Sequence, residues 1–213
     1  MEEIIKRYVE LFEQKYNDSS SYNSHLEGTE KINLAGITEK EVEDVIKPFL
    51  YKWGKMGRVL GRVEFQDWRG NLAEQIRSNY ERLKEFKAKD LADVDLSKLE
   101  SDIEKCYESL KEAVGRIGAA KVLHLICPSF FPLWDNDIAK AIRSELGEKR
   151  EGSKKVEDFS GLDYYRFMQK IQNLIKKYEK VLSVLSTLYK KGKLKILDEC
   201  LWWATHRPLS LFL

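Results

Sequence analysis

The feature that most constrains the fold is a long run of apolar residues at helical spacing near the C-terminus. From Leu162 to Leu188, apolar residues recur every three or four positions, which is the period of one face of an α-helix. Shorter stripes of the same kind lie within residues 2–16, 38–53 and 72–87. No segment of useful length alternates apolar and polar residues, as a half-buried β-strand would. We therefore predict an all-α fold.

The C-terminal stripe fits either one long helix of a globular protein or a coiled coil. Its aromatic members, such as Tyr165 and Tyr178, and the amphipathic segments before it favour packing inside one globule. We predict a continuous helix over 162–188 that ends by Gly192, followed by a last helix over 196–205.

Three segments carry the sequence signature of a helix start. Residues 38–41 (TEKE) and 97–100 (SKLE) have the spacing of a capping box, in which two side chains each accept a hydrogen bond from an otherwise free amide. Residues 160–163 (SGLD) resemble a third box. We predict that helices begin at these points, and that Pro48 kinks the first of them because proline lacks a backbone donor.

The length of the chain indicates its domain organisation. A chain of 213 residues can bury a core without disulfides or metals, so we predict a single all-α domain over 1–213, with two lobes that share a core as the alternative. Residues 17–37 are rich in polar and loop-forming residues, and we predict a long polar loop there.

Cysteine and histidine usage predicts no metal site. The three cysteines are odd in number and far apart, and the three histidines share no ligand spacing. His124 lies among apolar residues, which favours a core histidine over a catalytic one. The longest apolar run is too short to span a bilayer and the first residues are unlike a signal peptide, so we predict a cytoplasmic protein with no membrane partner.

Charge is nearly balanced overall but unevenly distributed. The chain has 37 lysines and arginines against 35 aspartates and glutamates. Residues 161–213 hold ten basic and four acidic residues, which predicts either a basic face for phosphate contact or ordinary solvated helix faces.

One stretch, residues 107–143, combines an apolar helix, a turn with Gly115 and Gly118, a short apolar helix, an aromatic loop and then Asp135 at the next helix start. This order resembles the core of the helix-hairpin-helix DNA glycosylase superfamily, and we assign that core to residues 97–147. The resemblance implies a DNA-binding protein in which the hairpin amides hold a phosphate.

The resemblance also implies which residues meet DNA. The hairpin contacts would come from Gly115, Arg116, Gly118, Ala119 and Lys121. Superfamily members commonly read glycine, apolar residue, glycine across the hairpin, whereas Arg116 takes the first glycine position here and Gly115 is displaced by one residue.

Asp135 matches the superfamily's catalytic aspartate, which stabilises positive charge on the sugar as the base leaves. An aspartate before an apolar run is also a common helix N-cap, and the two roles are compatible. Enzymes of this superfamily that also cleave the strand carry a lysine at the position of Ala120, and Lys121 lies one residue further on. The resemblance therefore implies base release without strand cleavage, and no cofactor, because the iron–sulfur cysteines are absent.

Two further groups are candidate DNA contacts. Lys55, Arg58 and Arg62 share one side if their glycine-rich segment is helical, and otherwise belong to a loop. Trp134, Trp202 and Trp203 are candidates to stack on an extruded base, the alternative being core packing. The sequence thus predicts a DNA-binding protein, with monofunctional base excision as its candidate activity and a non-catalytic helical binding or structural module as the alternative.

Overall fold

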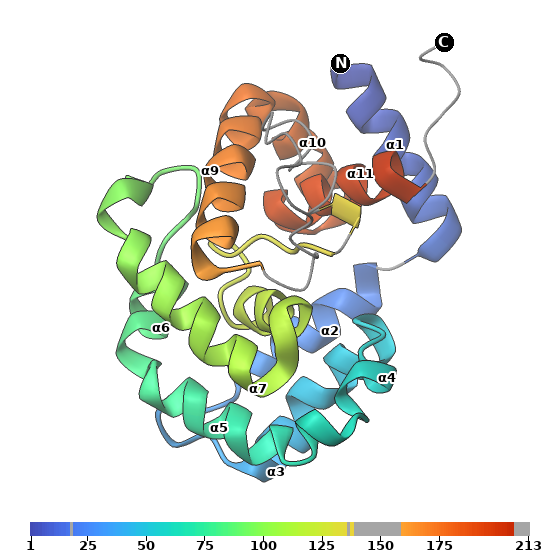
Figure 1. The fold of residues 1–213 in the computed structure, drawn as a ribbon. Coiled ribbons are helices and arrows are strands. Elements are labelled where there is room, and N and C mark those ends of the chain that lie inside the picture. The colour runs from blue at the N-terminus through green and yellow to red at the C-terminus, as the bar shows by residue number, and fades with distance from the viewer. Residues whose placement is uncertain (18, 136, 139–158, 207–213) are drawn as a thin grey trace, which may run out of the picture.

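The structure is a computed structural model that describes residues 1–17, 19–135, 137–138 and 159–206 (Figure 1). These residues form helices and connecting turns, and no β-strand occurs among them. The predicted all-α fold is confirmed.

The described helices vary widely in length. The α-helices are α1 (Glu2–Tyr16), α2 (Ser19–Glu30), α3 (Glu39–Glu41), α4 (Gly57–Leu60), α5 (Trp68–Ser78), α6 (Tyr80–Lys87), α7 (Glu100–Ile126), α9 (Gly161–Lys177), α10 (Glu179–Tyr189) and α11 (Lys193–His206). Short 3₁₀ turns are η1 (Leu34–Gly36), η4 (Val63–Phe65) and η5 (Leu96–Lys98), and two π-helical stretches are η2 (Val42–Ile46) and η3 (Phe49–Trp53).

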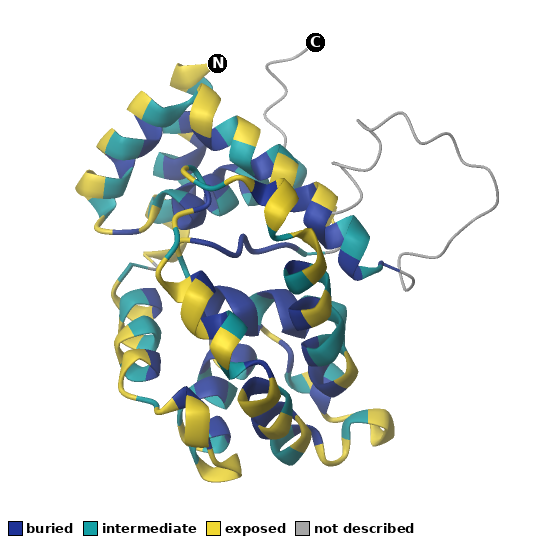
Figure 2. Cartoon of the chain, turned by 90° about the vertical axis from the view of Figure 1, so that its left-hand side faces the viewer, coloured by how far each residue is buried: buried dark blue, intermediate teal, exposed yellow. Residues whose placement is uncertain are grey.

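Helix α7 lies in the middle of the molecule and connects its two sides. It packs against α5, α6 and α2 on one side and against α9 on the other, while α1 packs against α11 and α10 (Figure 1). One connected cluster of buried apolar side chains extends from Ile5 to Trp203. Buried residues line the inner faces of these helices and exposed ones their outer faces, as Figure 2 shows. The segment from Cys127 to Trp134 is buried apart from Pro128 and Ser129, so it is fixed in place between α7 and α9.

The segment predicted to be a polar loop, residues 17–37, is mostly helical, and the prediction was wrong. Asn17 ends α1 in the left-handed conformation, and α2 begins two residues later at Ser19. Helix α2 has few apolar residues to reveal it, but Tyr22 is fully buried and its hydroxyl bonds His124 on α7 at 2.6 Å. A contact this distant in sequence stabilises a helix that local composition does not predict.

The long C-terminal helix is two helices. Tyr178 leaves the helical conformation (φ −114°, ψ 23°) and separates α9 from α10, so the segment turns and is not a coiled coil. Lys190, in the left-handed conformation, ends α10 before Gly192 is reached. The last helix, α11, is longer than the predicted 196–205.

Two of the three predicted capping boxes are present. Thr38 caps α3 and Ser160 caps α9, each with its reciprocal acidic partner. The box at Ser97 was predicted wrongly, because Ser97 instead bonds Asp95 within the 3₁₀ turn η5, and α7 begins after Leu99 without a side-chain cap. Near Pro48 the chain is π-helical on both sides, which accommodates the missing backbone donor.

Within the described part of the chain, no helix combines the length and the apolar character needed to cross a bilayer.

Candidate functional site

Helix α7 changes direction at Gly115, inside the stretch where a hairpin was predicted. Gly115 has φ 71° and ψ 168°, a conformation that residues with a side chain rarely adopt. A Cβ atom there would also lie 3.3 Å from Cζ of Phe65. The Tyr107 hydroxyl bonds the Arg116 carbonyl across the kink at 3.2 Å. Helix α7 therefore breaks at a position whose backbone conformation requires glycine.

The hairpin prediction requires Gly118 to lie at an accessible turn, but the structure places it elsewhere. It lies inside the second half of α7 and is buried, and a Cβ atom there would lie 2.9 Å from Cβ of Val114. Ala119 is also buried, whereas Gly115 and Arg116 are half-buried. The two ends of the predicted contact set, Gly115 and Arg116 at the kink and Lys121, are thus half-buried, and DNA contact by these residues stays a prediction.

The predicted basic group lies on the outside of the molecule. Lys55, Arg58 and Arg62 are exposed, on and around the short helix α4. Lys55 has a positive φ of 52°, so the chain turns sharply between η3 and α4. The segment is therefore part helix and part turn.

Lys121 connects this segment to α7. Its ammonium group donates a hydrogen bond to the Gly54 carbonyl at 2.6 Å. A Cβ atom on Gly54 would lie 2.8 Å from the Leu50 carbonyl oxygen and 3.1 Å from Cδ of Lys121, so the close approach depends on glycine. Gly54, whose role the sequence leaves open, is what makes room for the lysine.

The surroundings of Lys121 are unusual for a lysine. Burial lowers the pKa of its ammonium group to about 8, against the opposing effect of the Asp198 and Asp135 carboxylates. Lys195 and Lys55 lower the pKa further. Perturbed ionisable groups of this kind cluster at functional sites, although structural ion networks also contain them.

Asp135 lies at the start of the helical residues 137–138. Its Oδ1 atom accepts hydrogen bonds from the amides of Asp137 (2.9 Å) and Ile138 (2.8 Å), so the N-cap role is present. Its Oδ2 atom lies 3.8 Å from Nε2 of His206, and the side chain is 28% exposed. The cap fixes one carboxylate oxygen and leaves the other directed towards the end of α11.

Helix α11 supplies a group of buried charges that the sequence analysis missed. Lys195 Nζ lies 3.2 Å from Asp198 and 3.1 Å from Glu199, and Lys191 pairs with both Glu199 and Glu13. The Lys191, Lys195 and Glu199 side chains are fully buried. Burial raises the pKa of the Asp198 carboxyl, and the Lys195 charge opposes that shift. The sequence signal was the i, i+4 spacing of these charges on an otherwise apolar helix.

The three tryptophans proposed for base stacking have different surroundings. Trp134 is 3% exposed and its ring meets Tyr107, Phe159, Tyr164 and Phe167, so it is a core residue in this structure. Trp203 is also buried. Trp202 is half-buried and stacks on the His206 ring with centroids 4.3 Å apart. Only Trp202 keeps part of its ring surface open.

His124 is the core histidine that the sequence predicted. Its Nδ1 donates to the Phe131 carbonyl at 2.7 Å, because a carbonyl can only accept, and its Nε2 accepts from the Tyr22 hydroxyl. Burial lowers the pKa of the imidazole to about 4. The ring is therefore neutral at physiological pH and ties α2 to α7.

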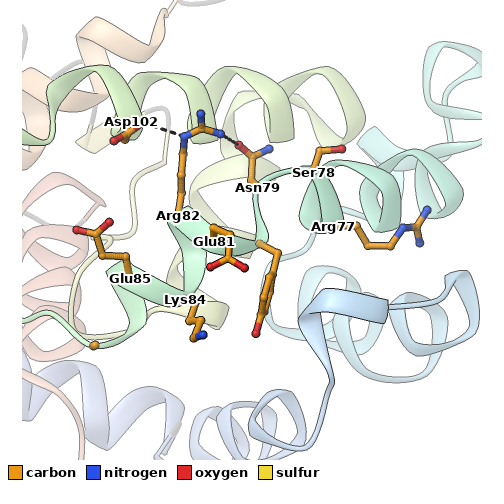
Figure 3. A pocket seen from close by; sticks show the side chains of 10 residues that line it. Arg77, Ser78, Asn79, Glu81, Arg82, Lys84, Glu85 and Asp102 are labelled. Carbon is orange, nitrogen blue, oxygen red and sulfur yellow. Dashed lines mark hydrogen bonds and ion pairs between the residues drawn. The ribbon is translucent and has the colours of Figure 1, made fainter.

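Asp135 lines none of three surface cavities formed by residues in the described part of the chain. The largest, of about 860 Å³, lies between α5, α6 and the start of α7 (Figure 3). Arg82 crosses it and is already bonded to Asp102 at 2.8 Å and to Asn79 at 3.3 Å. These polar groups satisfy one another, so the cavity does not have the convergent polar groups of a reaction centre.

Among the residues described, no group of three or more histidine, cysteine, aspartate or glutamate side chains is placed to hold a metal ion. All three cysteines are buried, and burial raises the pKa of the Cys106 thiol to about 12, so this thiol is unreactive.

Asp135 thus lies beside His206 of α11, and the charges of Asp135 and Asp198 act on Lys121 of α7. Comparison of the chain with protein-family models, with curated proteins and with solved structures finds no match.

Proposed function

We propose that this protein binds DNA and releases a base from it, with Asp135 stabilising the positive charge that develops on the sugar. One observation carries the proposal: the carboxylate of the helix-capping Asp135 acts on Lys121, a half-buried lysine of lowered pKa, and both residues belong to one stretch of the chain. The order of elements in that stretch is what resembles the helix-hairpin-helix glycosylases. The proposal therefore rests on residue pattern and electrostatics together.

The carboxylate of Asp135 is suited to charge stabilisation. Two backbone amides fix its Oδ1 atom, and a fixed charge needs no reorganisation when the sugar becomes cationic. The glycosidic bond breaks with both electrons going to the base, so the sugar carbon becomes oxocarbenium-like and a nearby negative charge lowers the barrier. Water then adds to that carbon.

Strand cleavage is a second candidate activity, favoured by the lowered pKa of Lys121. Sequence spacing argues against it, because Ala120 occupies the position where a lysine is expected. A pKa of about 8 nevertheless leaves a larger neutral fraction of the amine than an ordinary lysine has. A neutral amine can add to the aldehyde of an abasic sugar with loss of water, giving an imine. Lys121 would have to leave the Gly54 carbonyl to do so.

A non-catalytic binding protein is the rival function. Its support is that Asp135 already serves as a helix cap and lines none of the three cavities described above. In that case Lys121 only ties α7 to the turn at Gly54. The two functions differ in whether a base is released.

The deciding experiment measures base release from oligonucleotides that carry uracil, hypoxanthine, 8-oxoguanine or alkylated purines, with alkali to reveal abasic sites. For a responding substrate, Asp135→Asn should keep DNA affinity and the cap but lower the rate at least about a hundredfold, as loss of a preorganised charge does. Asp95→Asn, which changes the capping carboxylate of η5, is the matched control and should leave the rate unchanged.

Two results would reject the catalytic proposal. The first is no release from any substrate by the unaltered protein, at protein excess and with DNA binding confirmed. The second is equal rates for Asp135→Asn and the unaltered protein. Borohydride trapping on an abasic oligonucleotide tests strand cleavage separately, and a covalent complex lost in Lys121→Met would support the imine.

DNA binding has its own test in the exposed bases near α4. Replacing Lys55, Arg58 and Arg62 by alanine should weaken binding and lower its dependence on salt, because each phosphate contact releases counterions. Lys98→Ala, on the exposed turn η5, is a control of the same charge type. Equal affinities and salt slopes for the triple variant and the unaltered protein would remove this group from the DNA contact.

A further inference from the structure

His206 joins the last turn of α11 to the acidic residues at Asp135. Its Nε2 atom lies 3.1 Å from Oδ2 of Asp137 and 3.8 Å from Oδ2 of Asp135. These carboxylates follow the buried segment that ends at Trp134, so the contact links two elements that are distant in sequence. The His206 side chain is 27% exposed.

The ring of His206 is oriented by three contacts with two residues of its own helix, Trp202 and Thr205. Its Nδ1 atom lies 3.0 Å from the Trp202 carbonyl and 3.0 Å from Oγ1 of Thr205. Its plane is stacked on the Trp202 indole, 9° from parallel. Trp202 is in turn held by edge-on contacts with Phe12 and Tyr16 of α1. The imidazole is thus fixed before any ligand arrives.

Both ring nitrogens face oxygen acceptors. The Trp202 carbonyl can only accept, so Nδ1 carries a proton, and the carboxylates of Asp137 and Asp135 require a proton on Nε2 as well. The arrangement is complete when the ring is an imidazolium. A cation at this place is also favoured by the C-terminal end of α11.

The two carboxylates lie at different distances from the ring. The shorter contact, 3.1 Å, is to Asp137, so an imidazolium pairs most closely with that carboxylate. Asp135 is held from two directions, with Oδ1 bonded to the helix amides and Oδ2 beside the ring at the longer distance.

We propose that His206 is a positioning residue for Asp135: as an imidazolium it holds Asp137 and orients the Asp135 carboxylate. This inference rests on the proposed base release. Within residues 1–17, 19–135, 137–138 and 159–206, the charged groups that face the ring are Asp135 and Asp137. Trp202 and Thr205 face it from α11, and Tyr16 of α1 packs against Trp202. Lys121 and Asp198 act on Asp135 itself.

The test measures single-turnover base release and DNA affinity for three variants, at about pH 6 and about pH 8, on either side of the usual imidazole range. The unaltered protein should be faster at the lower pH. His206→Gln should be about tenfold slower there, the scale of one hydrogen bond to a charged group, and should lose the pH difference. His206→Arg, which keeps a cation, should retain the rate at both pH values, and His25→Gln on α2 is the matched control. Affinity should be unchanged in all three.

A second arm needs no DNA. The imidazole ¹⁵N resonances of His206 at about pH 6 should be those of a doubly protonated ring and should shift in Asp137→Asn more than in Asp135→Asn. Base release with the same pH profile in His206→Gln as in the unaltered protein would overturn the inference alone. So would equal losses of rate in the Gln and Arg variants, or His206 resonances that ignore both substitutions. Absence of base release from the unaltered protein would overturn the proposed function and this inference with it.

Discussion

Two buried regions of the molecule differ in the kind of side chain they contain, one being aromatic and the other charged. The first, the aromatic cluster, consists of Tyr107, Trp134, Phe159, Tyr164 and Phe167. Its two tyrosine hydroxyls end on the carbonyls of Arg116 and Pro132, and the Tyr107 and Tyr164 rings are stacked 4.5 Å apart. The second, the charge cluster, consists of Glu13, Lys191, Lys195, Asp198 and Glu199.

The two regions contribute to stability with opposite sign. Aromatic burial removes large apolar surfaces from water and adds ring contacts, which stabilises the fold. Burying charges costs desolvation energy that pairing recovers only in part, and Glu199 has one buried carboxylate oxygen with no hydrogen-bond partner. A costly cluster beside Lys121 and Asp135 is consistent with a role in the candidate site, whereas the aromatic cluster is explained by packing, at the cost of one buried nitrogen, Nε1 of Trp134, without a hydrogen-bond partner.

The largest effect is expected in the aromatic cluster. Trp134→Ala should lower the free energy of unfolding by about 3–5 kcal/mol, because it leaves a cavity among four other rings. Urea unfolding followed by circular dichroism measures this. Val63→Ala, at a position that is 88% exposed, is the control and should change little. A loss below about 1 kcal/mol for Trp134→Ala would show that the cluster is loosely packed.

The charge cluster should respond differently to single and double substitution. Lys195→Met should lower the free energy of unfolding by about 3 kcal/mol, because Glu199 and Asp198 lose a buried partner. Glu199→Gln should also destabilise the protein. The double variant should lose less than the two single variants together, because each substitution removes a charge that the other leaves unpaired. Additive losses would mean that the two residues act independently, and the contrast with the aromatic cluster would fail.

The cost of burying a charge should depend on pH at Lys121. Its lowered pKa means that, between about pH 8 and the ordinary lysine range, the unfolded chain binds a proton that the folded protein has released. Stability of the unaltered protein should therefore rise with pH across that window, and the desolvation cost should be present below it. Lys121→Met should remove roughly 2 kcal/mol of this rise.

The measurement is the free energy of unfolding at about pH 7 and about pH 10, compared between variants so that other titrating groups cancel. Lys105→Met, on the exposed face of α7, should follow the unaltered protein. A rise with pH that survives in Lys121→Met would assign it to another group.

Much of the fold could be predicted from residues that are close together in sequence. The helical stripes and the boxes at 38–41 and 160–163 depend on residues within one or two turns of each other, and these predictions are confirmed. The break at Tyr178 was missed because apolar spacing continues through it, although the backbone does not. Helix α2 was missed because its main anchor, the bond from Tyr22 to His124, spans 102 residues.

The candidate site was only partly predictable for the same reason. Asp135 and Lys121 come from one stretch and could be read from its pattern. Asp198 and His206 reach them from the end of the chain, and Lys191 pairs with Glu13, which is 178 residues away. Sequence spacing indicates a basic C-terminal segment but not that its lysines are buried. These lysines form a cluster with Glu13 only because α1 packs against α11.

The smallest change in stability is expected at the surface, outside both clusters. It distinguishes the two segments, 38–41 and 97–100, that both have the sequence of a capping box. Thr38 accepts a hydrogen bond from the Glu41 amide at 3.2 Å, so Thr38→Ala should cost about 1 kcal/mol of stability. Ser97 caps no amide of α7 and bonds only Asp95, so Ser97→Ala should change stability by less than about 0.5 kcal/mol. The pair is matched in chemistry and in exposure, and both variants can be compared in one urea titration. Equal losses would mean that the box at 97–100 forms after all, and α7 would then begin at Ser97, as its sequence suggested.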